Sequence, residues 1–285
     1  MSDRDGADGS RCGRRWLVRG VLAAAASVLV VALTSSVAAL PAGASTTVVV
    51  LQMNLCNSGA STSCYSFGAA VKNAVAKIHR YRPQLVTFQE ICRDDLYADR
   101  GFGPLARAMA DLYGSRQIRV VFTPARSRTT GGPYHGCVNG QEYGVGIVYY
   151  GTGGEVHQGW YTNQGRGGEV RAWGCATIMQ GRLTGCTTHL TINREVSMRQ
   201  CRELVAMLTS ASWVTPQVVV AGDLNLAVEA GTPSDVRTCV PPGYDRRGDD
   251  SVQHMLFTAG VTWLDGHAEP LAGTDHPLLY ARFRV

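Results

Sequence analysis

The chain has 285 residues, of which 45% are hydrophobic and 17% are charged, so it is typical of a globular protein and not of an intrinsically disordered one. The formal net charge is +5, and the first 44 residues, with five arginines and three aspartates, carry +2 of it. The remaining +3 tolerates an anionic substrate but does not by itself indicate a nucleic-acid binder.

The first 44 residues have the three parts of an export signal. A basic stretch is followed by an apolar run, 21–40, and by small residues that end in Ala44. We therefore expect cleavage after Ala44, which leaves 45–285 as one secreted domain without a transmembrane anchor. The pair Arg14-Arg15 also resembles a twin-arginine signal, so two export routes stay open. An uncleaved apolar run of this length could span a bilayer, but the small residues favour cleavage.

The next part of the chain alternates strands and helices. Apolar, β-branched runs predict strands, and apolar residues three or four apart predict helices. The expected strands are 47–53, 85–88 and 118–122, and the expected helices are 67–81 and 105–112. Residues 124–142 are rich in Gly, Pro, Arg and Thr, so they predict a long surface loop, and loops of this length often serve function.

The second half is richer in strands. They are expected at 144–150, 170–179, 182–190, 218–221, 252–257, 261–264 and 278–283, with one amphipathic helix at 195–213. Strands and helices do not alternate strictly here, which disfavours a doubly wound sheet. The predicted fold class is α/β with mixed (α+β) sheets, arranged as a four-layer sandwich of two packed mixed β-sheets flanked by helices.

Eight of the nine cysteines follow the export signal, and an even number in that context predicts disulfides. No two cysteines have the CxxC spacing, which disfavours a structural zinc site. Cys175 and Cys186 lie equally far from a turn at Gln180-Gly181, so a hairpin would place them opposite each other at disulfide distance. Cys56–Cys64, which would close a short loop, is the second expected pair, and the other pairings stay open.

Polar side chains stand at the ends of several apolar strands, where α/β enzymes place their active sites. Taken singly, an Asn or Asp in such a position is usually a turn or cap residue. The whole set is therefore more informative than any member. It consists of Asn54, Glu90, His189, Asp223, Asn225, Asp275 and His276.

Five short segments around these residues resemble the endonuclease/exonuclease/phosphatase superfamily, which includes the DNase I-like nucleases. They are Leu51-Gln52-Met53-Asn54, Phe88-Gln89-Glu90, Thr187-Thr188-His189-Leu190, Gly222-Asp223-Leu224-Asn225 and Thr274-Asp275-His276-Pro277. Each is weak alone, but all five occur in the family's order. The resemblance covers about residues 47–285 and implies hydrolysis of phosphoesters with a divalent cation, Mg²⁺ or else Mn²⁺ or Ca²⁺.

The resemblance also implies a role for each residue. Glu90 would be the main metal ligand, and Asn54 and Asp275 would lie close to the metal. His276 would be the general base that activates water, and His189 would hold or protonate a phosphate oxygen. The remaining roles are phosphate binding by Arg171 and orientation of the nucleophile by Asp223 and Asn225.

The sequence departs from the family where an Asp usually orients the last histidine. Gln253, at the start of the predicted strand 252–257, occupies this position. Its carbonyl could still accept the ring N–H of His276, but it supplies no charge, so His276 should be a weaker base. Asp249 or Asp250 could substitute only if the loop rearranged, because both are out of register.

These features favour a secreted, metal-dependent nuclease that acts on DNA or RNA as a monomer, without a stable protein partner. The alternatives are a phosphatase or a phospholipid (sphingomyelinase-like) phosphodiesterase with the same chemistry. A catalytically weak binding protein on the same fold is a third hypothesis, which the nearly complete set of polar residues disfavours and Gln253 favours.

Overall fold

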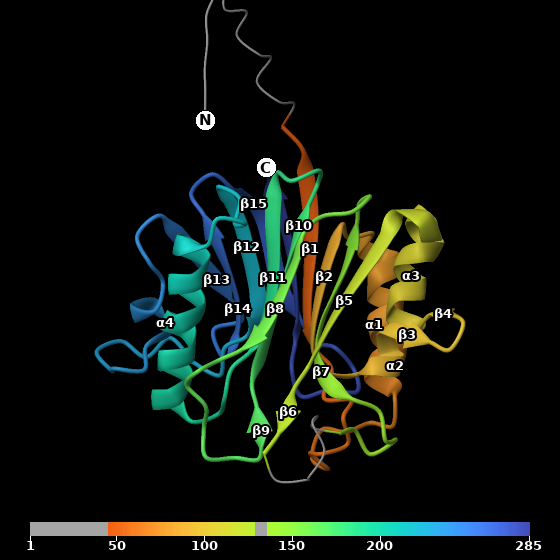
Figure 1. Cartoon of the computed structure of the whole chain (residues 1–285), viewed down its shortest axis with the longest axis horizontal. Helices are drawn as coiled ribbons and strands as arrows, with labels where there is room; N and C mark the ends of the chain where they lie inside the picture. The colour runs from red at the N-terminus through yellow and green to blue at the C-terminus, as the bar shows by residue number, and fades with distance from the viewer. Residues whose placement is uncertain (1–44, 129–135) are drawn as a thin grey trace, which may run out of the picture. The chain divides into compact units, whose positions relative to one another are not determined.

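Two six-stranded sheets form the centre of the protein (Figure 1). The computed structural model describes residues 45–128 and 136–285. The first sheet has the order β15-β16-β1-β2-β7-β5 and the second β13-β14-β12-β11-β10-β8. The strands of the first are β1 (Thr47–Asn54), β2 (Leu85–Cys92), β5 (Ile118–Pro124), β7 (Tyr143–Tyr150), β15 (Thr262–Glu269) and β16 (Leu278–Arg284). Those of the second are β8 (Val156–Trp160), β10 (Ala172–Ile178), β11 (Leu183–His189), β12 (Gln217–Asp223), β13 (Tyr244–Gly248) and β14 (Gln253–Thr258).

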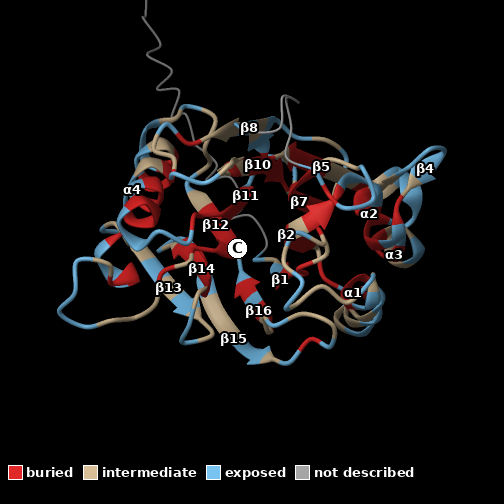
Figure 2. Ribbon diagram, turned by 90° about the horizontal axis from the view of Figure 1, so that it is seen from below, coloured by how far each residue is buried: buried red, intermediate tan, exposed pale blue. Residues whose placement is uncertain are grey.

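Helices cover the outer face of each sheet. The α-helices are α1 (Ala69–Tyr81), α2 (Arg93–Leu96), α3 (Pro104–Tyr113) and α4 (Arg194–Ser210). Short 3-10 helices are η1 (Ser115–Gln117) and η2 (Val236–Thr238), and two small ribbons pair β3 (Tyr97–Ala98) with β4 (Gly101–Phe102) and β6 (Arg126–Ser127) with β9 (Glu169–Val170). Figure 2 shows α1 and α3 on one side of the buried sheets and α4 on the other.

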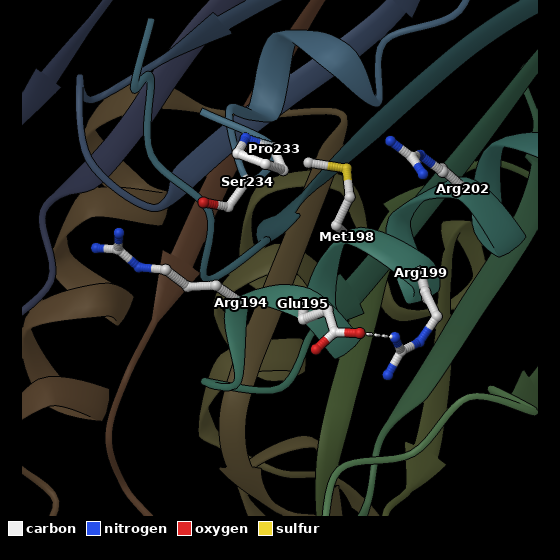
Figure 3. Close-up of a pocket in the computed structure, with 7 residues that line it drawn as sticks. All are labelled: Arg194, Glu195, Met198, Arg199, Arg202, Pro233 and Ser234. Atoms are coloured by element: carbon white, nitrogen blue, oxygen red, sulfur yellow. Dashed lines mark hydrogen bonds and ion pairs between the residues drawn. The ribbon is translucent and has the colours of Figure 1, made fainter. Parts of the chain in front are cut away.

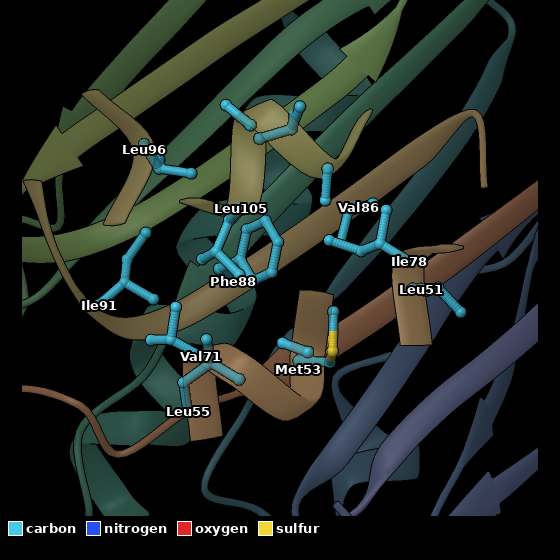
Figure 4. Close-up of a cluster of buried hydrophobic side chains, with 14 of the residues drawn as sticks. Leu51, Met53, Leu55, Val71, Ile78, Val86, Phe88, Ile91, Leu96 and Leu105 are labelled. Atoms are coloured by element: carbon cyan, nitrogen blue, oxygen red, sulfur yellow. The ribbon is translucent and has the colours of Figure 1, made fainter. Parts of the chain in front are cut away.

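Three layers of buried apolar side chains separate the four layers of backbone. The first lies between the first sheet and α1 and α3, and includes Phe88, Ile78 and Leu105 (Figure 4). The second joins the inner faces of the two sheets, and the third packs the second sheet against α4. Full burial of one large aliphatic or aromatic side chain contributes about 1.5–3 kcal/mol, so these layers are the main source of stability. The predicted four-layer sandwich is confirmed.

Each sheet contains one parallel pair of strands, and these pairs position the site. β1 and β2 are parallel and joined through α1, while β11 and β12 are parallel and joined through α4. The other strand pairs within the two sheets are antiparallel. Both parallel pairs point their carboxyl ends to the same end of the sandwich, because Asn54 at the end of β1 contacts Asp223 at the end of β12.

The structure differs from the sequence-based prediction at several element boundaries. Helix α1 begins at Ala69, because Phe67 has a φ of 52° and is 87% exposed. The strand predicted at 170–179 is interrupted at Arg171 and divides into β9 and β10. The edge strands β8 and β13 were not predicted, since their mixed polar sequences lack an apolar face.

Parts of two predictions lie outside the described residues. They are the export signal, 1–44, and the centre of the predicted surface loop, 129–135. The described part of that loop contains β6 and an isolated bridge between Gly136 and Glu142. Among the described residues, no helix combines the length and the apolar character that crossing a membrane requires.

The eight described cysteines form four disulfides. Cys175 and Cys186 are directly paired in the β10–β11 hairpin and are linked, as predicted. Residues 179–182 connect the two strands. Because this segment is centred on residues 180 and 181, the pairing of the strands is the one that a two-residue turn there would give. Cys56–Cys64 is also confirmed. The pairings that the sequence left open are Cys92–Cys137 and Cys201–Cys239.

Candidate active site

Four side chains from the ends of the two parallel strand pairs meet at one end of the sandwich. The Asn54 amide nitrogen donates to Glu90 Oε1 at 3.0 Å and to Asp223 Oδ2 at 2.9 Å. Nε2 of His189 lies 3.9 Å from Glu90 Oε1 and 4.0 Å from Asp223 Oδ2. One amide thus holds two carboxylates close together, with a histidine facing both. Asn54 Oδ1 accepts from the backbone N–H of Cys56 at 3.1 Å.

A β-bulge directs Glu90 into this cluster. The pairing of β2 with β7 shifts between Phe88 and Ile91, and Glu90 has a φ of 54°. A bulge turns a side chain away from the regular alternation of the strand. The carbonyls freed from the sheet accept from the loop after β1, Gln89 from Leu55 and Glu90 from Asn57. Burial raises the pKa of the Glu90 carboxyl above its usual range, and the negative charge of Asp223 adds to the effect.

His189 is buried and neutral at pH 7. Burial lowers its pKa well below the usual value, and the positive charge of Arg171 contributes. Its Nδ1 lies 3.4 Å from the hydroxyl of Tyr143. A neutral imidazole offers one donor and one acceptor, so His189 can donate a hydrogen bond to a phosphate oxygen without adding a positive charge that would repel a cation.

One terminal nitrogen of the Arg171 guanidinium is paired with a carboxylate, and the other has no partner among the described residues. Nη2 lies 3.1 Å from Oε2 of Glu169, and the side chain is only 12% exposed. Nη1 is buried and has no hydrogen-bond partner among the described residues. Burial by itself lowers the pKa of Arg171, but Glu169, followed by Tyr143 and Glu90, outweighs it and raises the pKa. A permanently charged donor therefore remains available beside the carboxylates.

Asp223 is held by donors on every side. Besides Asn54, the Gln253 amide nitrogen donates to Oδ2 at 2.8 Å, and the backbone N–H of Asn225 donates to Oδ1 at 2.9 Å. Asn225 adopts a left-handed conformation, φ 48°, which asparagine tolerates better than most residues. Its side-chain nitrogen donates to the carbonyl of Leu190 at 2.8 Å and so ties the end of β12 to the end of β11.

His276 approaches Oδ2 of Asp223, whereas the backbone of Asn225 contacts Oδ1. Its Nε2 is 3.8 Å from Asp223 Oδ2, and its Nδ1 is 3.0 Å from the Gln253 amide nitrogen. The expectation that the Gln253 carbonyl accepts from the ring is therefore wrong, because that carbonyl accepts from Gln52. Thr274 fastens the loop, since its hydroxyl donates to the Asn54 carbonyl at 3.0 Å.

Asp275 lies at the rim. Its side chain is 59% exposed, and Oδ1 is 3.5 Å from Nε2 of His276. It also belongs to one of two groups of described Cys, Asp or Glu residues whose potential ligand atoms lie within 4.8 Å of one another. The cysteines of both groups are in disulfides, so neither group offers thiolate ligands. The groups are Cys56, Cys64, Asp275 and Cys92, Asp94, Asp95.

The cluster has donors of the kind that a hard divalent cation prefers. Glu90 and Asp223 provide carboxylate oxygens, and a cation beside them would offset both the burial that raises the pKa of Glu90 and the smaller effect of the charge on Asp223. Glu90 could hold such an ion, whereas Asn54 turns its amide nitrogen toward the two carboxylates and Asp275 lies beside His276, so neither presents an expected ligand oxygen to Glu90 in this structure. The two carboxylates fit a cation of the Mg²⁺ type.

A pocket apart from this cluster is lined by residues of α4 and of the loop before η2 (Figure 3). Two of its arginines are neutralised, because Arg194 pairs with Glu229 at 2.6 Å and Arg199 with Glu195 at 2.5 Å. None of the strand-end residues of the cluster lines it. Its lining residues are Arg194, Glu195, Met198, Arg199, Arg202, Pro233 and Ser234.

Several solved structures share this architecture. Humanized D. rerio TDP2 is 15% identical, with a TM-score of 0.55, covering 84% of this chain and 99% of that one. ANGEL2, a 2',3'-cyclic phosphatase, is 11% identical, with a TM-score of 0.57, covering 84% and 95%. The endonuclease/exonuclease/phosphatase from Beutenbergia cavernae DSM 12333 is 15% identical, with a TM-score of 0.59, covering 84% and 72%. This chain has the endonuclease/exonuclease/phosphatase fold. No protein-family model and no curated protein matches its sequence.

On this endonuclease/exonuclease/phosphatase fold, the site includes residues that the sequence did not single out. Glu169 is one of them: it lies two residues from Arg171, a spacing that puts both side chains on one side of an extended chain and could have suggested the pair. Tyr143, Gln52 and Gln89 had no such signal, because their partners come from strands far away in the sequence.

Proposed function

We propose that this protein is a divalent-metal-dependent phosphoester hydrolase. The observation that carries the proposal is the convergence of two neighbouring carboxylates, Glu90 and Asp223, with two histidines and a buried arginine whose Nη1 has no partner among the described residues. Hydrolysis of a phosphoester requires positive charge around the phosphoryl oxygens and a polarised water, and these residues can supply both.

In this proposal each residue has a distinct task. When bound, the cation would neutralise negative charge on the phosphoryl group. Glu90 would hold the cation, with Asn54 and Asp275 beside it. Nη1 of Arg171 would donate to a phosphoryl oxygen, and neutral His189 would contact a second one.

Asp223, whose position is fixed by three donors, would orient the attacking water and accept its proton as the new P–O bond forms. Asn225 would maintain that orientation by joining the ends of β11 and β12. In this proposal Arg171, His189 and Asp223 would lie around the phosphoryl group, as in-line attack on phosphorus requires.

As substrate we propose a nucleic-acid phosphodiester. The mildly positive charge after residue 44 is compatible with a polyanion. One structure with the same fold is D. rerio TDP2 complexed with single-strand DNA product, at 13% identity. Mg²⁺ is the proposed metal, with Mn²⁺ or Ca²⁺ as alternatives, and the proposed form is a monomer.

A phospholipid phosphodiester is the second candidate, and two exposed apolar side chains favour it. Phe67, 87% exposed, follows Ser66, whose hydroxyl donates to the carbonyl of Gly273 in the loop before His276. Ile192, 77% exposed, comes three residues after His189. Both side chains therefore extend from segments that adjoin the site, where they could touch a lipid surface.

One assay tests the proposal and separates the substrates. The purified protein is incubated with Mg²⁺ or with EDTA, against plasmid DNA, RNA, sphingomyelin vesicles and inositol phosphates. We expect Mg²⁺-dependent cleavage of DNA or RNA, which His189→Ala abolishes. Cleavage of sphingomyelin alone would favour the second candidate. If the folded protein showed no metal-dependent turnover on any substrate, the proposed enzyme activity would be refuted.

We also propose that the protein is exported. Four disulfides favour an oxidising compartment over the cytosol. Expression of the full chain with and without residues 1–44, followed by fractionation, tests this. Export that did not depend on residues 1–44 would contradict the assignment of the signal.

A further inference from the structure

Three buried glutamines connect the two sheets beneath the site. Gln52 in β1, Gln89 in β2 and Gln253 in β14 are fully buried. The amide nitrogen of Gln52 donates to the carbonyls of both other glutamines. Gln89 donates onward to the hydroxyl of Thr187 at 3.0 Å. A continuous hydrogen-bonded chain therefore runs across the interface between the sheets and ends below His276.

The direction of every amide in this chain is set by one carboxylate. Asp223 can only accept, so Gln253 must present its amide nitrogen to Oδ2, at 2.8 Å. The Gln253 carbonyl then faces Gln52, which must present its own nitrogen. Turning Gln253 around would bring two acceptors together at Asp223 and two donors together at Gln52, in a fully buried position.

The same amide nitrogen of Gln253 lies 3.0 Å from Nδ1 of His276. An amide nitrogen donates and does not accept, so Nδ1 of His276 must carry its lone pair. The ring hydrogen that a histidine keeps when only one nitrogen is protonated is then on Nε2. An Asp in place of Gln253 would accept from Nδ1–H and leave the lone pair on Nε2, which is the tautomer that a general base requires.

We infer that Gln253 is a positioning residue that holds His276 in the Nε2–H tautomer, so that His276 donates a hydrogen bond to the substrate and does not act as the general base. This inference rests on the proposed function for the part that concerns the substrate. The tautomer itself rests only on the geometry around Gln253. In this tautomer, Nε2–H of His276 can donate to a phosphoryl or leaving-group oxygen.

The tautomer can be measured without turnover. In the purified protein, labelled with ¹⁵N-histidine and kept in EDTA at pH 8, a long-range ¹H–¹⁵N spectrum distinguishes the protonated nitrogen from the unprotonated one. Comparison with His276→Asn assigns the resonances. We expect Nε2 of His276 to be protonated. Protonation of Nδ1 in the unaltered protein would overturn the inference, whatever the activity of the enzyme.

Two matched variants test whether Gln253 is the cause. Gln253→Glu keeps the length and the acceptor for Gln52 but replaces the amide nitrogen that contacts both Asp223 Oδ2 and Nδ1 of His276 by an oxygen. Because this oxygen then faces the Asp223 carboxylate, a donor is needed beside it, so the proton of His276 should move to Nδ1. Gln89→Glu introduces the same change in the same chain without touching His276, and Nε2 should stay protonated. An unchanged tautomer in the first variant, or a changed one in the second, would refute the assignment.

Kinetics of the folded Gln253→Glu variant test the role of His276 as a donor. If Nε2–H donates to the substrate, loss of that proton should lower kcat by about 100-fold at saturating substrate, a typical contribution of a positioned proton donor. A higher kcat would show that His276 works as a base and would overturn this part. Absence of activity in the unaltered protein would refute the proposed function and leave the spectroscopic result as it stands.

Discussion

Substitutions at Arg171 and at its partner Glu169 can separate the contribution of Arg171 to stability from its proposed contribution to phosphate binding. Its Nη2 and Oε2 of Glu169 are 3.1 Å apart, and both side chains are mostly buried. At that distance and an effective dielectric constant of about 20, the Coulomb attraction is about 5 kcal/mol. Arg171→Met leaves Glu169 buried without its partner, which typically costs about 3–5 kcal/mol of unfolding free energy.

Protonation of Glu169 reduces this cost, because burial already raises the pKa of its carboxyl. The double variant Glu169→Gln/Arg171→Met removes both charges. We expect its unfolding free energy to return to within about 1–2 kcal/mol of the original protein, since replacing a buried ion pair by neutral groups is often close to neutral. Denaturant unfolding measures the unfolding free energy of the original protein, the two single variants and the double variant.

Activity should follow a different pattern across the same four proteins. Both proteins that lack Arg171 should lose about 100- to 1000-fold in kcat, the usual cost of one donor to developing negative charge. Glu169→Gln alone should retain most of the activity, because the guanidinium stays. Rates are measured with the substrate that the Mg²⁺ assay identifies. If the double variant regained both stability and activity, Arg171 would have no contact with phosphate.

Three further predictions concern the metal, the pH dependence and a disulfide. Loss of a residue that only supports a metal ligand typically weakens metal binding by roughly 10- to 100-fold. Glu90→Gln, which removes a ligand itself, should therefore raise the Mg²⁺ concentration for half-maximal activity by at least this factor. An unchanged Mg²⁺ titration would exclude Glu90 as a ligand. Burial lowers the pKa of His254 to about 4 from 6.5, so the unfolded chain binds a proton there that the folded one does not. The folded protein therefore loses about 3 kcal/mol of stability as the pH falls from 6.5 to 4, whereas His254→Gln does not, so the unfolding free energy of the protein relative to that of His254→Gln should fall by about 3 kcal/mol over this range. Replacing Cys201 and Cys239 by Ser opens a loop with a sequence separation of 38 and should cost about 4 kcal/mol in the chain-entropy model; a change below about 1 kcal/mol would show that the bond adds no constraint.

Much of the fold could be predicted from local patterns. A continuous apolar run such as 218–221 predicts a strand whose two faces are both buried. The spacing of Ala70, Val71, Ala74 and Ile78 predicts a helix with one buried face. The Cys175–Cys186 bond followed from equal distances to a turn. Strand-end residues such as Asn54 and Asp223 could be selected because parallel strands end at a common edge.

Tertiary structure decided what those side chains do. The bulge at Glu90 depends on the register between β2 and β7, and the free Nη1 of Arg171 depends on where Glu169 lies. The amide of Gln253 is oriented by Asp223 and by Gln52, which is 201 positions away. A sequence specifies which donors and acceptors exist, but a buried amide has two orientations. Partners from distant strands select between them, so the tautomer of His276 is a property of the folded protein alone.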